Sequence, residues 1–271
     1  MKSILLHVQD DDSLDRRIDD ALALARATTG HLSCIHVTPI EAYVAFDAFG
    51  GVFVMKDVIT ALDEQEKALS DKVQAKLGNE DISWDYEQIT GSIPGTIIRH
   101  AALSDVVIVG REKLVHAPES GSLSLLGSLL HRCRSPLLIP GTGGETYDPT
   151  GPLMIAWNGS HEAANAVRGA LGLMALASSV RVVCVDESDE GPFPSTRLME
   201  FLSRHGVHAD LHVEPLGESS TGPILLDQAE RMKAQTIVMG GYGHSRIGEF
   251  LFGGVTRSFL HNCPIAILVA H

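Results

Sequence analysis

The sequence predicts an α/β protein made of two tandem doubly wound parallel-sheet domains, Rossmann-like and related by a pseudo-twofold axis. The first observation is a repeat, because residues 3–37 and 152–186 both read as apolar run, polar turn, amphipathic helix and apolar run. The second observation is the composition of the apolar runs. VVIVG (106–110) and TIVMG (236–240), for example, are short, continuously apolar and rich in β-branched residues. Such runs are typical of parallel strands buried on both faces. With helical patterns between them, each half predicts about five strands and about four helices.

The two halves also end alike. Residues 95–110 resemble 222–240, and residues 135–141 resemble 263–270. Between the halves lies GTGGETYDPT, which is polar and rich in glycine and is therefore predicted to be a linker. We place the boundary near residue 146. The predicted domains are residues 1–145 and residues 146–271.

The first helix of each repeat has an apolar face and a serine at its start. Ser13 and Ser160 stand where N-caps are expected. Helical spacing places apolar side chains on one face of each helix. These are Leu14, Ile18, Leu22 and Ala25 in the first helix, and Val167, Leu171 and Met174 in the second.

The first half carries an additional stretch, residues 41–78. Its second part has a helical pattern. Its first part, residues 41–55, is apolar and fits either a flap or part of the interface between the halves.

Composition and charge exclude several classes of protein. The 271-residue chain has a formal net charge of −13, which disfavours DNA or RNA as a partner. No apolar run reaches the roughly eighteen residues of a membrane span. The N-terminal apolar run ends in three aspartates and is too short and too acidic for a signal peptide, so we expect a cytoplasmic protein.

Neither metal binding nor nucleophilic catalysis is predicted. The four cysteines form no CxxC pair and adjoin apolar runs, so we expect buried reduced thiols. His205, His208 and His212 pass from a helix end into a strand, so their side chains need not converge on a metal. No GxSxG elbow is present, and no serine, histidine and acid are spaced as a recognisable triad.

The most informative stretch is GGYGHSRIGEFLFGG, residues 240–254. Gly240 ends a predicted strand, and the glycines after it permit a tight turn. Gly253 and Gly254 interrupt a helical pattern at a cost of roughly 1 kcal/mol each. Backbone amides at such a loop–helix junction bind phosphate. The stretch is no P-loop, and Arg246 occupies the place of the third glycine of a GxGxxG motif.

With this motif the chain resembles a tandem member of the universal stress protein (UspA) family. Nucleotide-binding members carry G-x2-G-x9-G-(S/T) after the fourth strand, and Gly240, Gly243 and Gly253 match that spacing. Gly254 stands where the family has Ser or Thr, so only its backbone amide remains. The resemblance covers both halves apart from residues 41–55. It implies an adenine nucleotide alpha hydrolase-like fold that binds ATP with Mg²⁺, with ADP and AMP left open.

The resemblance also implies which residues contact the nucleotide. Adenine and ribose contacts would come from Ala156, Asn158 and Val185, with Asn158 replacing the usual aspartate. An amide still donates and accepts hydrogen bonds. The alternative for Asn158 is a turn residue that caps the next helix. The phosphates would be held by Gly243, His244, Gly253, Gly254 and Val255, and Arg246 would add positive charge.

The first half departs from the motif. Gly110 is followed by Arg111, Glu112 and Lys113, with no second glycine at the family spacing, and Gln9 stands where Asn158 does in the repeat. We predict that this half has lost nucleotide binding, or binds something else through Arg111 and Lys113.

Three functions follow, in order of preference. The first is regulatory nucleotide binding by the C-terminal half, with an unknown protein partner and at most weak ATPase activity. The second is an interaction module that binds no nucleotide. The third is an ATP-using enzyme with residues 41–55 as its lid. The two halves are expected to pack as an intramolecular pair, and a homodimer is left open.

Overall fold

The computed structural model describes most of the chain. The described residues are 1–39, 45–46, 52–53, 56–111, 124–186, 193–217, 219–241 and 254–271. Most of the predicted flap, residues 41–55, lies outside them. Its described part is two short antiparallel strands, β3 (Ala45–Phe46) and β4 (Val52–Phe53).

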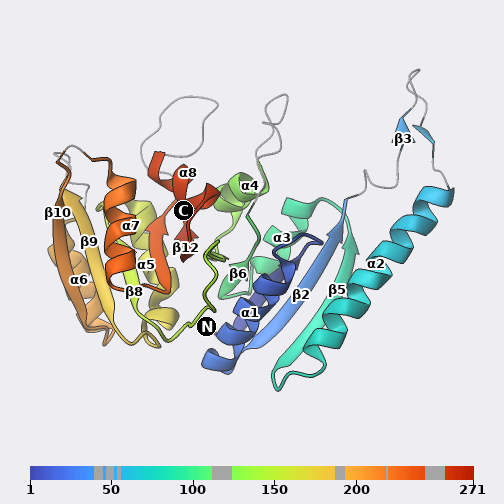
Figure 1. Ribbon diagram of the computed structural model, residues 1–271, viewed down its shortest axis with the longest axis horizontal. Helices are drawn as coiled ribbons and strands as arrows, with labels where there is room; N and C mark the ends of the chain where they lie inside the picture. The colour runs from blue at the N-terminus through green and yellow to red at the C-terminus, as the bar shows by residue number, and fades with distance from the viewer. Residues whose placement is uncertain are drawn as a thin grey trace.

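A single ten-stranded sheet runs through the molecule in the order β10-β9-β8-β11-β12-β7-β6-β1-β2-β5 (Figure 1). Each half contributes strands in the doubly wound order 3-2-1-4-5, and all pairs within a half are parallel. The halves meet at β7 and β12, which pair antiparallel with Leu138 opposite Leu268. This arrangement relates the halves by a pseudo-twofold axis. The predicted fold class is confirmed.

The described elements of each half alternate between strand and helix. The N-terminal half has β1 (Ser3–Val8), α1 (Leu14–Thr28), β2 (His31–Thr38), α2 (Lys56–Leu77), β5 (Ser83–Thr90), α3 (Ile93–Ala101), β6 (Val106–Ile108), α4 (Leu125–Arg132) and β7 (Leu137–Ile139). The C-terminal half has β8 (Leu153–Ala156), α5 (His161–Met174), β9 (Val180–Asp186), α6 (Ser195–Arg204), β10 (Ala209–Pro215), α7 (Thr221–Arg231), β11 (Thr236–Gly240), α8 (Gly254–His261) and β12 (Ala266–Ala270).

Two apolar cores lie on the two faces of the sheet. One joins the sheet to α1, α2, α5 and α6, and the other joins it to α3, α4, α7 and α8. Strand residues alternate between the cores, as the side chains of Leu6 and Leu5 do. This burial on both faces explains why the strand sequences are continuously apolar. No helix in the described part of the chain is long and apolar enough to cross a membrane.

The two predicted N-caps differ. Ser160 caps α5, because its hydroxyl oxygen accepts a hydrogen bond from the amide of Ala163 at 3.1 Å. Ser13 holds the N-cap position of α1 but makes no side-chain cap bond. Its hydroxyl donates instead to the carboxylate of Asp11 at 2.6 Å. In the turn before α1, the Asp11 carboxylate accepts hydrogen bonds from both the amide and the hydroxyl of Ser13, and these bonds take the place of the cap bond.

The linker between β7 and β8 is packed against the C-terminal half. The amides of Thr142 and Gly143 donate to the carbonyls of Cys263 and Pro264 at 2.8 and 3.0 Å. Tyr147 is buried, and its hydroxyl lies 3.2 Å from that of Thr236. The linker therefore strengthens the contact that β7 and β12 make.

Candidate functional site

The candidate site lies at the carboxyl ends of the strands of the C-terminal half. There the strand order reverses between β8 and β11, as it does at ligand sites of open α/β sheets. Ala156 ends β8 and pairs with Met239 of β11 on one side and with Val183 of β9 on the other. Val185 lies two residues further along β9. The register therefore brings Ala156, Val185 and Gly240 to one edge.

Asn158 follows β8 and is exposed. Its side-chain oxygen accepts a hydrogen bond from the amide of Ser160 at 3.2 Å, and Gly159 between them has a φ of 71°. This is an Asx turn that leads into α5. Asn158 is thus a turn residue, as the alternative predicted, but the N-cap of α5 is Ser160 and not Asn158. Contact of Asn158 with a ligand stays a prediction.

Gly240 has a packing role that the motif did not indicate. A Cβ atom at this position would lie 2.6 Å from the amide nitrogen of Ala163 and 2.8 Å from the carbonyl carbon of Glu162. The first turn of α5 therefore approaches β11 more closely than any side chain allows. The position requires glycine whether or not a ligand is bound.

Gly254 is different, because it faces open space. It is the first residue of α8, it is exposed, and a Cβ atom there would meet no atom within 4 Å. Val255 beside it is half-buried. In the first turn of the helix, the hydroxyl of Thr256 lies 3.5 Å from the carbonyl oxygen of Gly240. Thr256, which the sequence did not single out, thus links the start of α8 to the end of β11.

Four of the predicted phosphate contacts lie outside the described residues. They are Gly243, His244, Arg246 and Gly253, and their roles stay predictions. The described part of the site consists of Ala156, Asn158, Val185, Gly240, Gly254 and Val255.

In the N-terminal half, the carboxyl end of β1 corresponds to the candidate site at the end of β8. The fully buried side chain of Arg17 fills this position. Its guanidinium donates to the carbonyls of His7 and Gln9 at 3.2 and 2.9 Å and pairs with Asp11 at 3.1 Å. A Cβ atom on Gly110 would lie 2.5 Å from one of its nitrogens. Burial lowers the pKa of Arg17, and Asp11 acts in the opposite direction. The chain's own side chain thus occupies this end of β1.

Arg111 does not serve the N-terminal half as a free ligand-binding group. Its guanidinium crosses to the other half and donates to the carbonyls of Phe259, Leu260 and Cys263 at 2.5, 2.8 and 3.3 Å. It also donates to Pro140 at 3.0 Å. Burial lowers the pKa of Arg111 to about 10, which leaves it cationic at neutral pH. Arg111 therefore caps the C-terminal end of α8, and its guanidinium is engaged there and not in a ligand site of the N-terminal half. Lys113 lies outside the described residues.

One constellation of catalytic residue types escaped the sequence analysis. His31 lies between Ser83 and Asp85, with ring nitrogens 2.7 Å from the hydroxyl and 2.5 Å from the carboxylate. Alternation along two paired strands places them on one face, a signal that only the register reveals. The side chains of His31 and Asp85 are 43% and 54% exposed, so bulk water screens the network. A metal-binding group of three or more His, Cys, Asp or Glu is absent from the described residues.

Comparisons with known proteins agree with this architecture. Residues 150–271 match the family described as "Universal stress protein family". A solved universal stress protein from Archaeoglobus fulgidus DSM 4304 superimposes with a TM-score of 0.73 at 16% identity, over 99% of this chain and 96% of that one. A functionally unknown protein from Pseudomonas aeruginosa PAO1 gives 0.60 at 17% identity, over 100% and 92%. No curated protein matches the chain.

Proposed function

The C-terminal half of this chain is a universal stress protein domain and the N-terminal half repeats its fold, and on that premise we propose that the protein binds an adenine nucleotide, ATP or a close relative, in its C-terminal half only. One observation carries the proposal. Gly254 begins α8 at the carboxyl edge of β8 and β11, faces open space, and directly follows the last glycine of the family's spacing, at the position where the family has Ser or Thr.

The bound nucleotide would use the site in two parts. Ala156, Asn158 and Val185 would contact adenine and ribose. The phosphates would meet the backbone amides at Gly253, Gly254 and Val255, where the helix dipole favours negative charge. Gly243 and His244 would contribute from the loop, and Arg246 would add a cation. With ATP, Mg²⁺ would neutralise part of the phosphate charge.

We propose a regulatory role for this binding. None of the six described residues of the site carries a side chain that accepts a proton from water at neutral pH. We expect hydrolysis to be slow, and occupancy of the site would change the surface presented to a protein partner.

The position of Arg17 limits the number of nucleotides that we expect each chain to bind. Because the guanidinium fills the corresponding edge of β1 in the N-terminal half, we expect one nucleotide per chain. The same feature, with Gly254 in place of a hydroxyl residue, favours the second candidate, a module that binds a protein partner without nucleotide.

Mass spectrometry of small molecules released from the purified, denatured protein tests the proposal. Wild type is compared with Gly243→Val in the glycine loop and with Gly144→Val as a matched control, since Gly144 lies in the linker and faces open space. ATP, ADP or AMP near one per chain in wild type and the control, and its loss in Gly243→Val, is the expected result. If no nucleotide is released and millimolar Mg-ATP leaves the melting temperature unchanged, the nucleotide-free module is the better account.

A further inference from the structure

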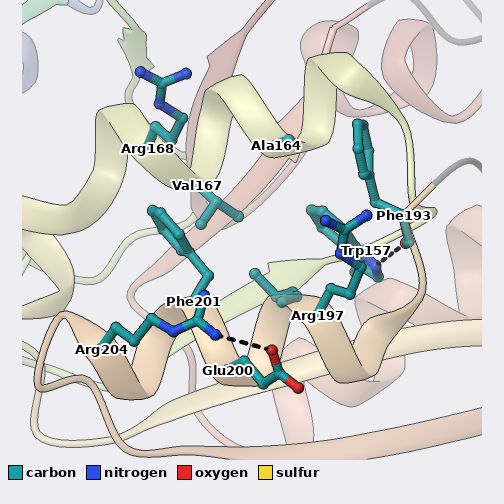
Figure 2. A pocket seen from close by; sticks show the side chains of 10 residues that line it. Trp157, Ala164, Val167, Arg168, Phe193, Arg197, Glu200, Phe201 and Arg204 are labelled. Atoms are coloured by element: carbon teal, nitrogen blue, oxygen red, sulfur yellow. Dashed lines mark hydrogen bonds and ion pairs between the residues drawn. The ribbon is translucent and has the colours of Figure 1, made fainter.

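A cavity of about 320 Å³ lies between α5 and α6 (Figure 2). Its lining comes from α5, α6 and the segments leading into them, on the face of the sheet opposite α7 and α8. The volume falls at the small end of the range for ligand pockets. A site for a small molecule is therefore possible there on size alone.

The floor of the cavity is apolar. Trp157, Val167 and Leu198 are buried, and the half-buried rings of Phe193 and Phe201 form its sides. The indole nitrogen of Trp157 donates to the carbonyl of Phe193 at 3.2 Å, so its polar group is satisfied within the protein. What the floor offers to an occupant is therefore aromatic and aliphatic carbon.

The rim carries the opposite charge to most of the molecule. Arg168, Arg197 and Arg204 line the cavity with a single acid, Glu200, in a chain whose formal net charge is −13. Glu200 pairs with Arg204 at 3.2 Å. Figure 2 shows Arg197 extending from α6 toward Trp157, whereas Arg168 points away from α6. Arg197 is thus placed to hold an anion above the aromatic floor.

We propose that this cavity binds a small organic anion, a carboxylate or sulfonate with an aromatic or aliphatic body. The body would cover Trp157, Val167 and Phe201, and removing these carbon surfaces from water supplies the affinity. The acid group would accept hydrogen bonds from the Arg197 guanidinium, whose donors fit a planar or tetrahedral oxyanion. The inference is independent of nucleotide binding, so either can fail alone.

The probe for this site is 8-anilinonaphthalene-1-sulfonate, an aromatic sulfonate. The chain has two tryptophans, so the Trp84→Phe variant leaves Trp157 as its only indole donor. Energy transfer from Trp157 to the bound probe then reports binding beside the cavity. Displacement by 3-phenylpropionate or octanoate tests whether a carboxylate competes for the same place.

Three further variants in this background separate the cavity from non-specific binding. Arg197→Gln removes the anion partner, and Ala164→Phe fills the cavity from α5. Arg231→Gln is the matched control, because it removes an equal charge from the exposed surface of α7, on the other face of the sheet. We expect Arg197→Gln to weaken binding about tenfold or more, the loss typical of a hydrogen-bonded charge. Ala164→Phe should abolish binding, and Arg231→Gln should leave it within about twofold.

Equal affinities for Arg197→Gln and Arg231→Gln would overturn the proposal. Energy transfer from Trp157 that an acidic aromatic peptide reverses, but neither carboxylate does, would also overturn it, because the cavity would then hold a protein segment. Circular dichroism of each variant checks that the fold is kept. If Ala164→Phe fails to fold, the comparison of Arg197→Gln with Arg231→Gln decides alone.

Discussion

Two glycines of one motif should respond in opposite ways to the same substitution. Neither Gly240 nor Gly254 has a positive φ, so alanine fits both backbones and only space distinguishes them. At Gly240 the new methyl group would lie 2.6 Å from the amide nitrogen of Ala163. The first turn of α5 must then retreat by roughly 0.8 Å to reach an ordinary contact distance, in an interior that is close-packed.

The size of the stability loss in Gly240→Ala follows from the contacts that this retreat of α5 disturbs. The amide of Ala163 is the one that donates to the Ser160 cap at 3.1 Å, so the cap is strained together with the packing. Overpacking typically costs about 1–3 kcal/mol and a lost cap about 1 kcal/mol. We expect Gly240→Ala to lower the free energy of unfolding by about 2–4 kcal/mol. At Gly254, where nothing lies within 4 Å, alanine should be neutral or stabilise by up to about 1 kcal/mol.

Urea denaturation followed by circular dichroism measures both variants against wild type. The prediction concerns the midpoint at constant slope, because a changed slope would indicate a changed unfolding mechanism. Equal midpoints for Gly240→Ala and Gly254→Ala would refute the packing argument for Gly240.

Three more predictions follow from the same geometry. Gly254→Ser restores the family hydroxyl in open space, so it should raise Mg-ATP affinity about threefold to tenfold in a calorimetric titration without loss of stability; a weaker affinity would contradict this. Arg111→Gln removes the guanidinium that donates to the carbonyls of Phe259 and Leu260. It should lower the free energy of unfolding by about 2 kcal/mol and speed hydrogen exchange in α8. Unchanged exchange in α8 would exclude a capping role. Burial lowers the pKa of His7 to about 3 from 6.5, so the unfolded chain takes up its proton first as pH falls. The contribution of neutral, buried His7 to the free energy of unfolding is therefore complete above pH 6.5. It falls between pH 6.5 and pH 3, by up to about 1.4 kcal/mol per pH unit. Wild type should therefore lose more stability than His7→Asn between pH 7 and pH 5, and equal losses would show that His7 titrates normally.

The fold could be predicted from the sequence because the signal is local and is repeated. Runs such as TIVMG identify strands by their own composition, and β11 spans the five residues of that run. The second copy of each pattern confirms the first, and the doubly wound order then follows from the rules for parallel sheets. The antiparallel joint at β7 and β12 agrees with the predicted pseudo-twofold.

The site was less predictable because its distinctive contacts are long-range. Arg111 reaches carbonyls that lie 148 to 152 residues along the chain, and no local pattern announces such a contact. Arg17 occupies one position of an amphipathic helix, yet its guanidinium bonds to the end of β1 and the turn after it and packs against Gly110, which lies far along the chain. Gly240 belongs to the predicted motif, but its need for glycine comes from the first turn of α5, a neighbour that the spacing alone does not reveal.

The direct test of the account is the stoichiometry of Mg-ATP binding, measured by isothermal titration calorimetry on wild type and Gly243→Val. We expect one site per chain in wild type and none in the variant, because Arg17 fills the carboxyl end of β1 in the N-terminal half, while the start of α8 is open in the C-terminal half. Two sites per chain, or one site that survives Gly243→Val, would contradict it.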